Sequence, residues 1–293
     1  MHEDISSNHF LLNRRLNNKS TPYLDPLNLV NWDCLSSDSY WLPESAISLY
    51  GTPYFDAFSC EQKIKLSHYE FINFVEAGLW LESLFMERIS RNLRLNHFDI
   101  ENACYHLHEL REEAGHSLMF LELVKKSGIS INNKHFRKIN FANLFAKFAK
   151  FDSVLFWLAV YMGEDIPDKL NRYIRAHRTD VCPCIVDIIN VHINDEARHI
   201  AHAKSKIFND NHETPFRFNK LYCLGINKVF SNFVDAYYYP PNSLYYAAGL
   251  DKRNNWNKIV KNSESRTVFI TNLTDQTRLT IQKNGVNILR TAG

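Results

Sequence analysis

Two segments of the chain repeat one pattern of side chains that bind metals. Glu113 and His116 are three residues apart, and Glu196 and His199 have the same spacing. Residues three apart on a helix share a face, so each pair would direct a carboxylate and an imidazole to one place. His192 falls on the stripe of Glu196 and His199, because each helical residue advances the direction by about 100°. Burying these groups without partners would cost on the order of several kcal/mol, so a metal ion is the first candidate for what they bind.

The duplicated pattern predicts a centre with two metal ions. Two Glu-x-x-His helices, each paired with a helix that donates one carboxylate, are the layout of four-helix di-iron and di-manganese carboxylate proteins. Glu164 is the predicted carboxylate of the third main helix, because it ends an apolar run where an unpaired charge would be costly. The first helix offers both Glu82 and Glu76. We favour Glu82, since its helical stripe is apolar or small, whereas the stripe of Glu76 carries Asn, Ser and Glu side chains.

Two acidic residues, Glu112 and Asp195, directly precede the glutamates of the repeated pattern. A histidine that binds a metal through one ring nitrogen usually donates its other N–H to an acceptor. We therefore expect a crossed arrangement in which Asp195 holds His116 and Glu112 holds His199. A solvent-exposed position for both acids is the alternative.

One further acid and the other histidines are placed by the same reasoning. His202 continues the stripe of His199, and we expect it to be an outer or capping imidazole. Glu109 either lines the pocket or lies on the surface. Five histidines are expected at the surface, namely His97, His106, His108, His135 and His177.

Long helices must position these residues. Ser59 and Gln62 form a capping box that starts a helical pattern reaching about residue 93. Asp99 caps a second long helix, which runs to about residue 126 and stops at Gly128. Pro167 is expected to kink or end the third main helix. Further helical patterns cover about 135–150, the stretch from 152 to Pro167, 183–208 and 218–238.

The expected fold is all-α, a ferritin-like four-helix bundle with additional helices and a short C-terminal β-hairpin. We divide the chain into an irregular entry segment at 1–58, the helical metal-binding bundle at 59–240 and a C-terminal extension at 241–293. The hairpin is predicted from "RTVFITN" and "TRLTIQK", which alternate like two strands around "LTDQ".

Composition limits the classes of partner. The 293 residues are 45% hydrophobic, with a net charge of +2, so no strong field favours nucleic acid or an anionic membrane. The six cysteines contain no CxxC pair, and we expect reduced thiols. The first residues lack an apolar signal core, and no apolar run reaches membrane-spanning length. We therefore expect a cytoplasmic protein.

The motifs resemble those of a known family. "DEARH" at 195–199 is similar to the Asp-Glu-x-x-His signature of ferritin-like dinuclear iron proteins, and the chain from about 45 to 240 resembles the p-aminobenzoate N-oxygenase family of di-iron oxygenases. The segments that carry the resemblance are "LPESAISLYGTPYFDAFSCEQ", "EEAGHSLMF", "YMGED" and "HINDEARH". That family has a third histidine four residues before the last glutamate, and His192 fills this position. The resemblance implies these metal ligands: Glu82, Glu113, His116, Glu164, His192, Glu196 and His199.

Membership of that family would imply an activity and its requirements. The expected reaction is O₂ activation at two iron ions, with manganese as the alternative metal, and oxygen transfer to a small organic substrate, often an arylamine nitrogen. Catalytic roles would fall on Glu113, Glu196 and His192. Two external electrons for each O₂ imply a ferredoxin or reductase partner. A homodimer is a candidate assembly.

Three other functions share parts of this pattern. A ribonucleotide reductase small subunit, or a related radical generator, has both Glu-x-x-His motifs but would not need His192 and would need an oxidisable tyrosine near the metals. A ferritin-like protein would store iron. A third alternative is a ligand-binding protein that kept the fold and lost turnover.

Overall fold

The protein is described by a computed structural model that covers residues 2–95, 99–130, 141–208, 220–283 and 285–288. All regular elements in these ranges are helical, which confirms the all-α prediction. The α-helices are α1 (His2–Lys19), α2 (Pro26–Leu29), α3 (Pro53–Asp56), α4 (Cys60–Leu95), α5 (Ile100–Ser127), α6 (Phe141–Phe148), α7 (Val154–Ala176), α8 (Pro183–Phe208), α9 (Lys220–Tyr238), α10 (Asn242–Ala247), α11 (Trp256–Lys261) and α12 (Glu264–Lys283). Short 3₁₀ turns cover Trp32–Cys34, Glu44–Ala46 and Arg178–Asp180.

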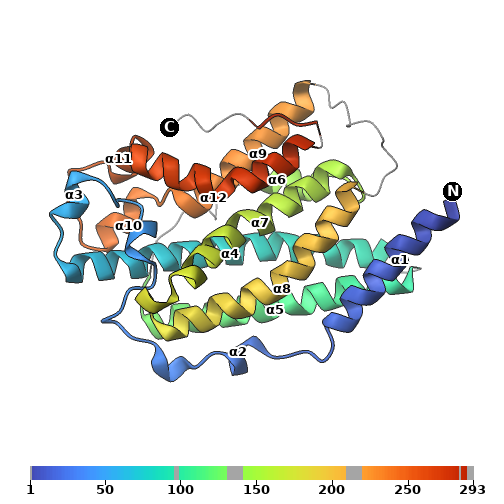
Figure 1. Ribbon diagram of the computed structural model, residues 1–293, viewed down its shortest axis with the longest axis horizontal. Coiled ribbons are helices and arrows are strands. Elements are labelled where there is room, and N and C mark those ends of the chain that lie inside the picture. Colours follow the sequence, from blue (N-terminus) through green and yellow to red (C-terminus); the bar gives the residue numbers. More distant parts are fainter. Residues whose placement is uncertain (1, 96–98, 131–140, 209–219, 284, 289–293) are drawn as a thin grey trace.

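Four long helices, α4, α5, α7 and α8, form the central bundle (Figure 1). Helix α7 packs along α8 and α4 along α5, while α5 also contacts α8 and α4 contacts α7. Large apolar side chains from each helix fill the interior, among them Phe71, Met119, Trp157 and Ile188, none more than 2% exposed. The bundle therefore has the layout that the paired Glu-x-x-His helices predict.

Further helices cover two sides of the bundle (Figure 1). Helices α9 and α12 pack against α7, and α11 contacts α12. On another side, α1 and α2 pack across α5 and α8. No helix in the described ranges is both long and apolar enough to span a bilayer.

The predicted start signals of the first two long helices, and the predicted end signal of the second, are confirmed. Ser59 and Gln62 make both hydrogen bonds of a capping box, with 3.2 Å from Gln62 N to Ser59 Oγ and 2.9 Å from Ser59 N to Gln62 Oε1. Asp99 Oδ1 accepts from Asn102 N at the start of α5. Gly128 ends α5 with a φ of 63°, a left-handed conformation that glycine adopts without steric cost. Local chemistry therefore fixes the start of α4 and both ends of α5.

The predicted C-terminal β-hairpin is wrong, because α12 covers both of its segments. The buried positions of α12 are Arg266, Ile270, Thr274, Thr277 and Ile281, which recur every three or four residues. This is a helical stripe. The sequence did not reveal this stripe, because three of its five buried residues are polar. The alternation of β-branched residues along the same segment instead favoured strands.

Arg266 fixes α12 to two distant segments. Its Nη1 donates to the carbonyl of Ala46 at 2.9 Å, and its Nε and Nη2 donate to the carbonyl of Tyr238 at 3.1 and 2.7 Å. Farther along α12, Thr277 Oγ1 donates to Asp165 Oδ2. The C-terminal helix therefore supports α7 beside Glu164.

Two other expectations differ from the structure. The segment expected to be irregular contains α1, whose Asn17 donates to the backbone and side chain of Glu101 at 3.1 Å. A helix that packs through polar side chains lacks the apolar periodicity from which helices are predicted. Pro167 does not end α7, which continues to Ala176. The lost backbone hydrogen bond is offset by packing, because Pro167 and most of its neighbours in α7 are buried.

Candidate metal centre

The bundle interior brings together all seven residues that the sequence singled out as ligands. They are no more than 6% exposed. Helix α4 contributes Glu82, α5 contributes Glu113 and His116, α7 contributes Glu164, and α8 contributes His192, Glu196 and His199. The helical spacing of three and four residues directs each set to the interior.

Six of these side chains form two groups of three. One group is Glu82, His116 and His192, and the other is Glu113, Glu196 and His199. Within each group the donor atoms lie within 4.8 Å of one another. Each group offers both carboxylate oxygen and imidazole nitrogen, which suits iron and manganese.

Glu113 belongs to the second group and also faces the first. Its Oε1 is 3.0 Å from His199 Nδ1, and its Oε2 is 3.5 Å from His116 Nδ1. Glu196 Oε1 is likewise 3.5 Å from both His192 Nε2 and His199 Nδ1. These two carboxylates, one from each Glu-x-x-His motif, are therefore placed where a bridging ligand would lie.

The two candidates on α4 differ in their surroundings. Glu82 is 5% exposed, belongs to the first group and accepts a hydrogen bond from Ser117 Oγ at 2.5 Å. Glu76 is half-buried and belongs to neither group. The geometry supports Glu82 as the ligand from this helix.

Glu164 lies beside the group of Glu113, Glu196 and His199 rather than within it. Burial, and then the nearby carboxylates of Glu196 and Glu113, raise its pKa well above the ordinary value of a glutamate. Such crowding of carboxylates favours either a shared proton or a cation between them. Glu164 therefore remains a candidate ligand from α7.

The crossed contacts expected around the histidines are present. His116 Nε2 is 3.0 Å from Asp195 Oδ2, and His199 Nε2 is 3.0 Å from Glu112 Oε2. In both rings Nδ1 is left facing the interior. An acceptor at Nε2 fixes the tautomer that has its lone pair on Nδ1.

Arg198 is a residue of this network that the sequence reasoning left without a role. Its Nη2 is 2.5 Å from Asp195 Oδ1 and 2.8 Å from Glu112 Oε1. One guanidinium therefore joins the two acids that hold the histidines. The sequence feature that could have predicted this role is its position three residues after Asp195, on the same helical face.

The inward-facing atoms fit a pair of metal ions. Several of them make no hydrogen bond with any described residue: Glu82 Oε1, both carboxylate oxygens of Glu113 and of Glu196, His116 Nδ1 and His199 Nδ1. Leaving a buried polar atom without a partner costs about 1–3 kcal/mol, and more for a charged group. Two divalent cations would satisfy all of these atoms at once.

The carboxylates around two of the imidazoles raise their pKa. Burial lowers the pKa of His199, but Glu113 and Glu196 outweigh it and raise this pKa well above the ordinary value. For His116, Asp195 and Glu113 likewise outweigh burial and raise the pKa. Protons therefore compete with a metal at these two rings, because a histidine binds a metal in its neutral form.

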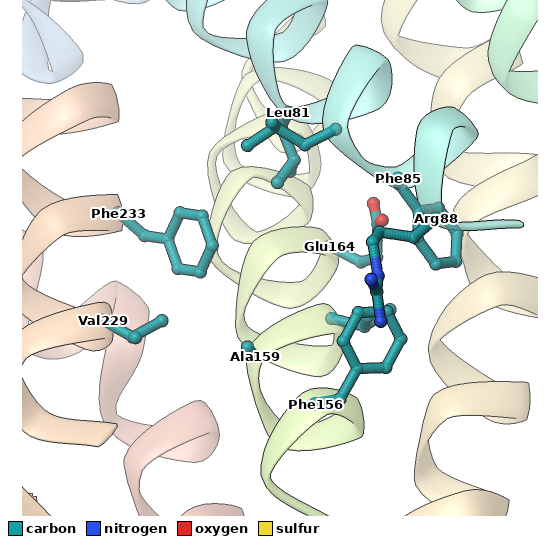
Figure 2. A pocket seen from close by; sticks show the side chains of 10 residues that line it. Leu81, Phe85, Arg88, Phe156, Ala159, Glu164, Val229 and Phe233 are labelled. Atoms are coloured by element: carbon teal, nitrogen blue, oxygen red, sulfur yellow. The ribbon is translucent and has the colours of Figure 1, made fainter. Parts of the chain in front are cut away.

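An apolar pocket adjoins this centre (Figure 2). Side chains from α4, α7 and α9 line it, including Leu81, Phe85, Phe156 and Phe233, with the Glu164 carboxylate in its wall. Its volume is about 50 Å³. That exceeds the roughly 30 Å³ of one water but is well below the roughly 300 Å³ of a typical ligand pocket. A substrate would have to displace side chains in order to enter.

Three residues next to the candidate ligands, His106, Glu109 and His202, are buried. His106 was expected at the surface but is 1% exposed, because it lies on the inner face of α5. Glu109 and His202 are both fully buried. His108 and His177 are half-buried, whereas His97 and His135 lie outside the described residues.

The fold and the paired Glu-x-x-His helices define a class, the ferritin-like proteins with a non-haem dinuclear metal centre. Members of this class place carboxylates and imidazoles of four helices around two metal ions. Within it, the model of the family described as p-aminobenzoate N-oxygenase AurF matches residues 9–282, and the chain belongs to this family.

Similar proteins extend this comparison. Uncharacterized protein Mb0909 of Mycobacterium bovis and uncharacterized protein Rv0885 of Mycobacterium tuberculosis are each 26% identical over 191 residues, which is 62% of this chain and 54% of each relative. The chain thus spans about half the length of these curated relatives.

Solved structures share the fold. An R2-like ligand-binding oxidase with an aerobically reconstituted Mn/Fe cofactor has a TM-score of 0.53 and 14% identity, over 96% of this chain and 94% of that one. A variant of that oxidase with an anaerobically reconstituted cofactor has a TM-score of 0.55 and 14% identity, over 95% and 93% of the two chains.

Proposed function

We propose that the protein is a di-iron oxygenase that transfers oxygen from O₂ to a small, largely apolar organic substrate, with an arylamine nitrogen as the first candidate. The observation that carries this proposal is the position of Glu164, which lies beside Glu113 and Glu196 of the second group of candidate ligands and also in the wall of an apolar pocket. Metal centre and substrate site would therefore share one side chain.

The proposed ligands are the seven buried residues of the candidate centre. When bound, the two metal ions would supply the electrons and open coordination positions that O₂ activation requires. Iron is the expected metal. Manganese at one position is the alternative, because similar folds were solved with a Mn/Fe cofactor.

The protein's own residues supply position, charge and the exclusion of water. Glu113 and Glu196 each lie near an imidazole of the first group and an imidazole of the second group. They are therefore the proposed bridging carboxylates. Asp195 and Glu112 orient His116 and His199. The apolar side chains around Glu164 exclude water from the substrate side.

His192 separates this function from that of a radical generator. Its Nε2 is 3.7 Å from Glu82 Oε1 and 3.5 Å from Glu196 Oε1, so it faces the same space as the other candidate ligands. Incorporating one oxygen atom into a substrate and reducing the other to water takes two external electrons and two protons. A ferredoxin-like protein or a reductase is the proposed donor.

A second candidate function rests on Tyr237 of α9. Its hydroxyl is buried and has no hydrogen-bond partner among the described residues. Burial, and then the charges of Glu164 and Glu82, raise its pKa well above the ordinary value. A tyrosine this close to the centre is what a radical generator requires.

The two functions are separated by product analysis. Protein reconstituted with Fe²⁺ and supplied with electrons and O₂ should convert a member of an arylamine panel to an oxygenated product, detected by mass spectrometry with labelled O₂. His192→Ala should keep much of its iron and lose this product, whereas Tyr237→Phe should keep it. A stable tyrosyl radical that disappears in Tyr237→Phe, with no product from the panel, would instead support the radical generator.

A further inference from the structure

A second cluster of metal-binding side chains lies in the bundle, one helical turn from the candidate dinuclear centre. His106 and Glu109 come from α5 and His202 comes from α8, and their donor atoms lie within 4.8 Å of one another. All three side chains are at most 1% exposed. Glu109 precedes Glu113 by four residues and His202 follows His199 by three, so the cluster continues the interior stripe of both helices.

Of the two contacts to Glu109, the one from His106 is a hydrogen bond and the one from His202 is too long to be one. His106 Nδ1 is 3.2 Å from Glu109 Oε2, and His202 Nδ1 is 3.6 Å from Glu109 Oε1. The second distance is too long for an N–H···O hydrogen bond. Ligands about 2.1 Å from a tetrahedral ion are separated from each other by about 3.4 Å, which lies between the two observed values.

The atoms of the cluster also lack other partners. Both ring nitrogens of His202, Nε2 of His106 and Oε1 of Glu109 make no hydrogen bond with any residue that the structure describes. The ring of His202 is enclosed by aromatic side chains, with centroids of Tyr105 and Trp157 at 4.4 and 5.0 Å. Polar atoms buried this deeply without partners are rare and need an explanation.

The protonation states are those that a metal requires. Burial acts to raise the pKa of Glu109, but His106 and His202 outweigh it and lower the pKa, so the carboxylate is ionised at neutral pH. Burial lowers the pKa of His202 to about 3, so this imidazole is neutral and has a lone pair to donate. An anionic carboxylate and a neutral imidazole are the forms that bind metals.

We propose that His106, Glu109 and His202 bind a single divalent transition-metal ion, separate from the dinuclear centre. Two imidazoles and one carboxylate form a ligand set that binds Zn²⁺ and Fe²⁺ in proteins, with water completing the coordination. The ion would join α5 to α8 one turn beyond the dinuclear centre. This site does not depend on the substrate proposed above.

Metal stoichiometry tests the proposal directly. Metal-free protein loaded with Co²⁺ or Zn²⁺ and freed of excess metal should contain one ion more per chain than the dinuclear centre holds. Glu109→Gln and His202→Asn should each lose that one ion and keep the other two. His68→Asn is the matched control, because His68 is also buried but is hydrogen-bonded to the carbonyl of Ser39; it should keep the wild-type metal content.

Anomalous diffraction from wild-type crystals grown with Zn²⁺ provides a readout that does not depend on whether the variants fold. A peak between the side chains of His106, Glu109 and His202 is expected, in addition to those of the dinuclear centre. Anomalous density confined to the dinuclear centre would overturn the proposal. Wild-type metal content in both cluster variants would also overturn it.

Discussion

Asn171 of α7 and His192 of α8 are joined through their side chains, with 3.1 Å between Asn171 Nδ2 and His192 Nδ1. The amide N–H donates to Nδ1, so the neutral ring carries its proton on Nε2, which faces Glu82 and Glu196. Asn171 Oδ1 is buried and makes no hydrogen bond with any described residue. Rotation of the amide by 180° would present this oxygen to Nδ1–H and place the lone pair on Nε2, the form that binds a metal. In that rotated form Asn171 would orient His192 as Asp195 and Glu112 orient the other two histidines.

Asn171→Leu should weaken the metal position near His192. Leucine removes the amide oxygen that would accept from Nδ1–H once the amide rotates, and loss of such an acceptor typically lowers metal affinity or activity by about 10–100-fold. Asn171→Asp supplies an acceptor at this position without rotation and should retain metal binding close to the wild-type level. Titration of the metal-free variants with Fe²⁺, followed by absorbance and metal analysis, measures the change. Equal affinity in Asn171→Leu and the wild type would remove this role.

The choice between the two glutamates of α4 can be tested by metal content. Glu82→Ala should lose metal, because Glu82 lies in a group with His116 and His192. Glu76→Ala should leave the metal content unchanged, since Glu76 belongs to neither group. Both variants are compared by mass spectrometric metal analysis after the same Fe²⁺ reconstitution. Loss of metal in Glu76→Ala alone would show that the other carboxylate is the ligand.

The sequence contained enough information to bring the candidate ligands together, because each of them is placed by local helical geometry. Glu113 and His116 share a face through their spacing alone, and capping at Asp99 fixed where their helix begins. The same reasoning missed His106, although it lies one helical turn before Glu109. Burial of a lone histidine depends on which helices pack against it, and single-sequence periodicity does not carry this information. The hairpin error has a similar cause, because the buried stripe of α12 includes Arg266 and Thr277, whose hydrogen-bond partners are distant in sequence.

The size of the pocket beside Glu164 should determine which substrates enter. Leu81→Ala removes part of its wall and should increase turnover of bulkier arylamines relative to small ones. The stability cost should be below the ~2–5 kcal/mol of a fully buried leucine, because Leu81 is only half-buried. Gly163→Ala is the opposite change, since an added Cβ would lie 3.1 Å from Leu81 Cδ1 and 3.4 Å from Phe233 Cζ. Competition between a small and a bulky substrate measures both effects, and identical selectivity in the two variants would place the substrate elsewhere.

Glu70 should make stability depend on pH away from the metal centre. Burial raises the pKa of Glu70 to about 7, although Arg266 and Ser48 act to lower it. A folded-state pKa above the unfolded value of 4.5 means that the folded protein binds the proton more tightly. Stability from this residue is therefore fully present below about pH 4.5 and is lost as pH rises to about 7, a difference of about 3 kcal/mol.

Urea unfolding at several pH values checks this expectation for Glu70. Glu70→Gln should be more stable than the wild type at pH 8, and its stability should vary less between pH 5 and pH 7. Glu61→Gln is the control, because Glu61 is exposed at the start of α4, and it should follow the wild-type profile. A Glu70→Gln profile parallel to that of the wild type would contradict the assignment.

The guanidinium of Arg266 sets an order of events during synthesis of the chain. It donates to the carbonyl of Ala46, a residue made 220 positions earlier. All the helices that carry the candidate ligands are therefore synthesised before α12, the helix that carries Arg266. Contacts between such distant positions form late, because a long loop must close first. In chains arrested before α12 emerges, α7 and α9 should be cleaved by protease. Release of α12 should protect both helices, because α12 then packs against α7.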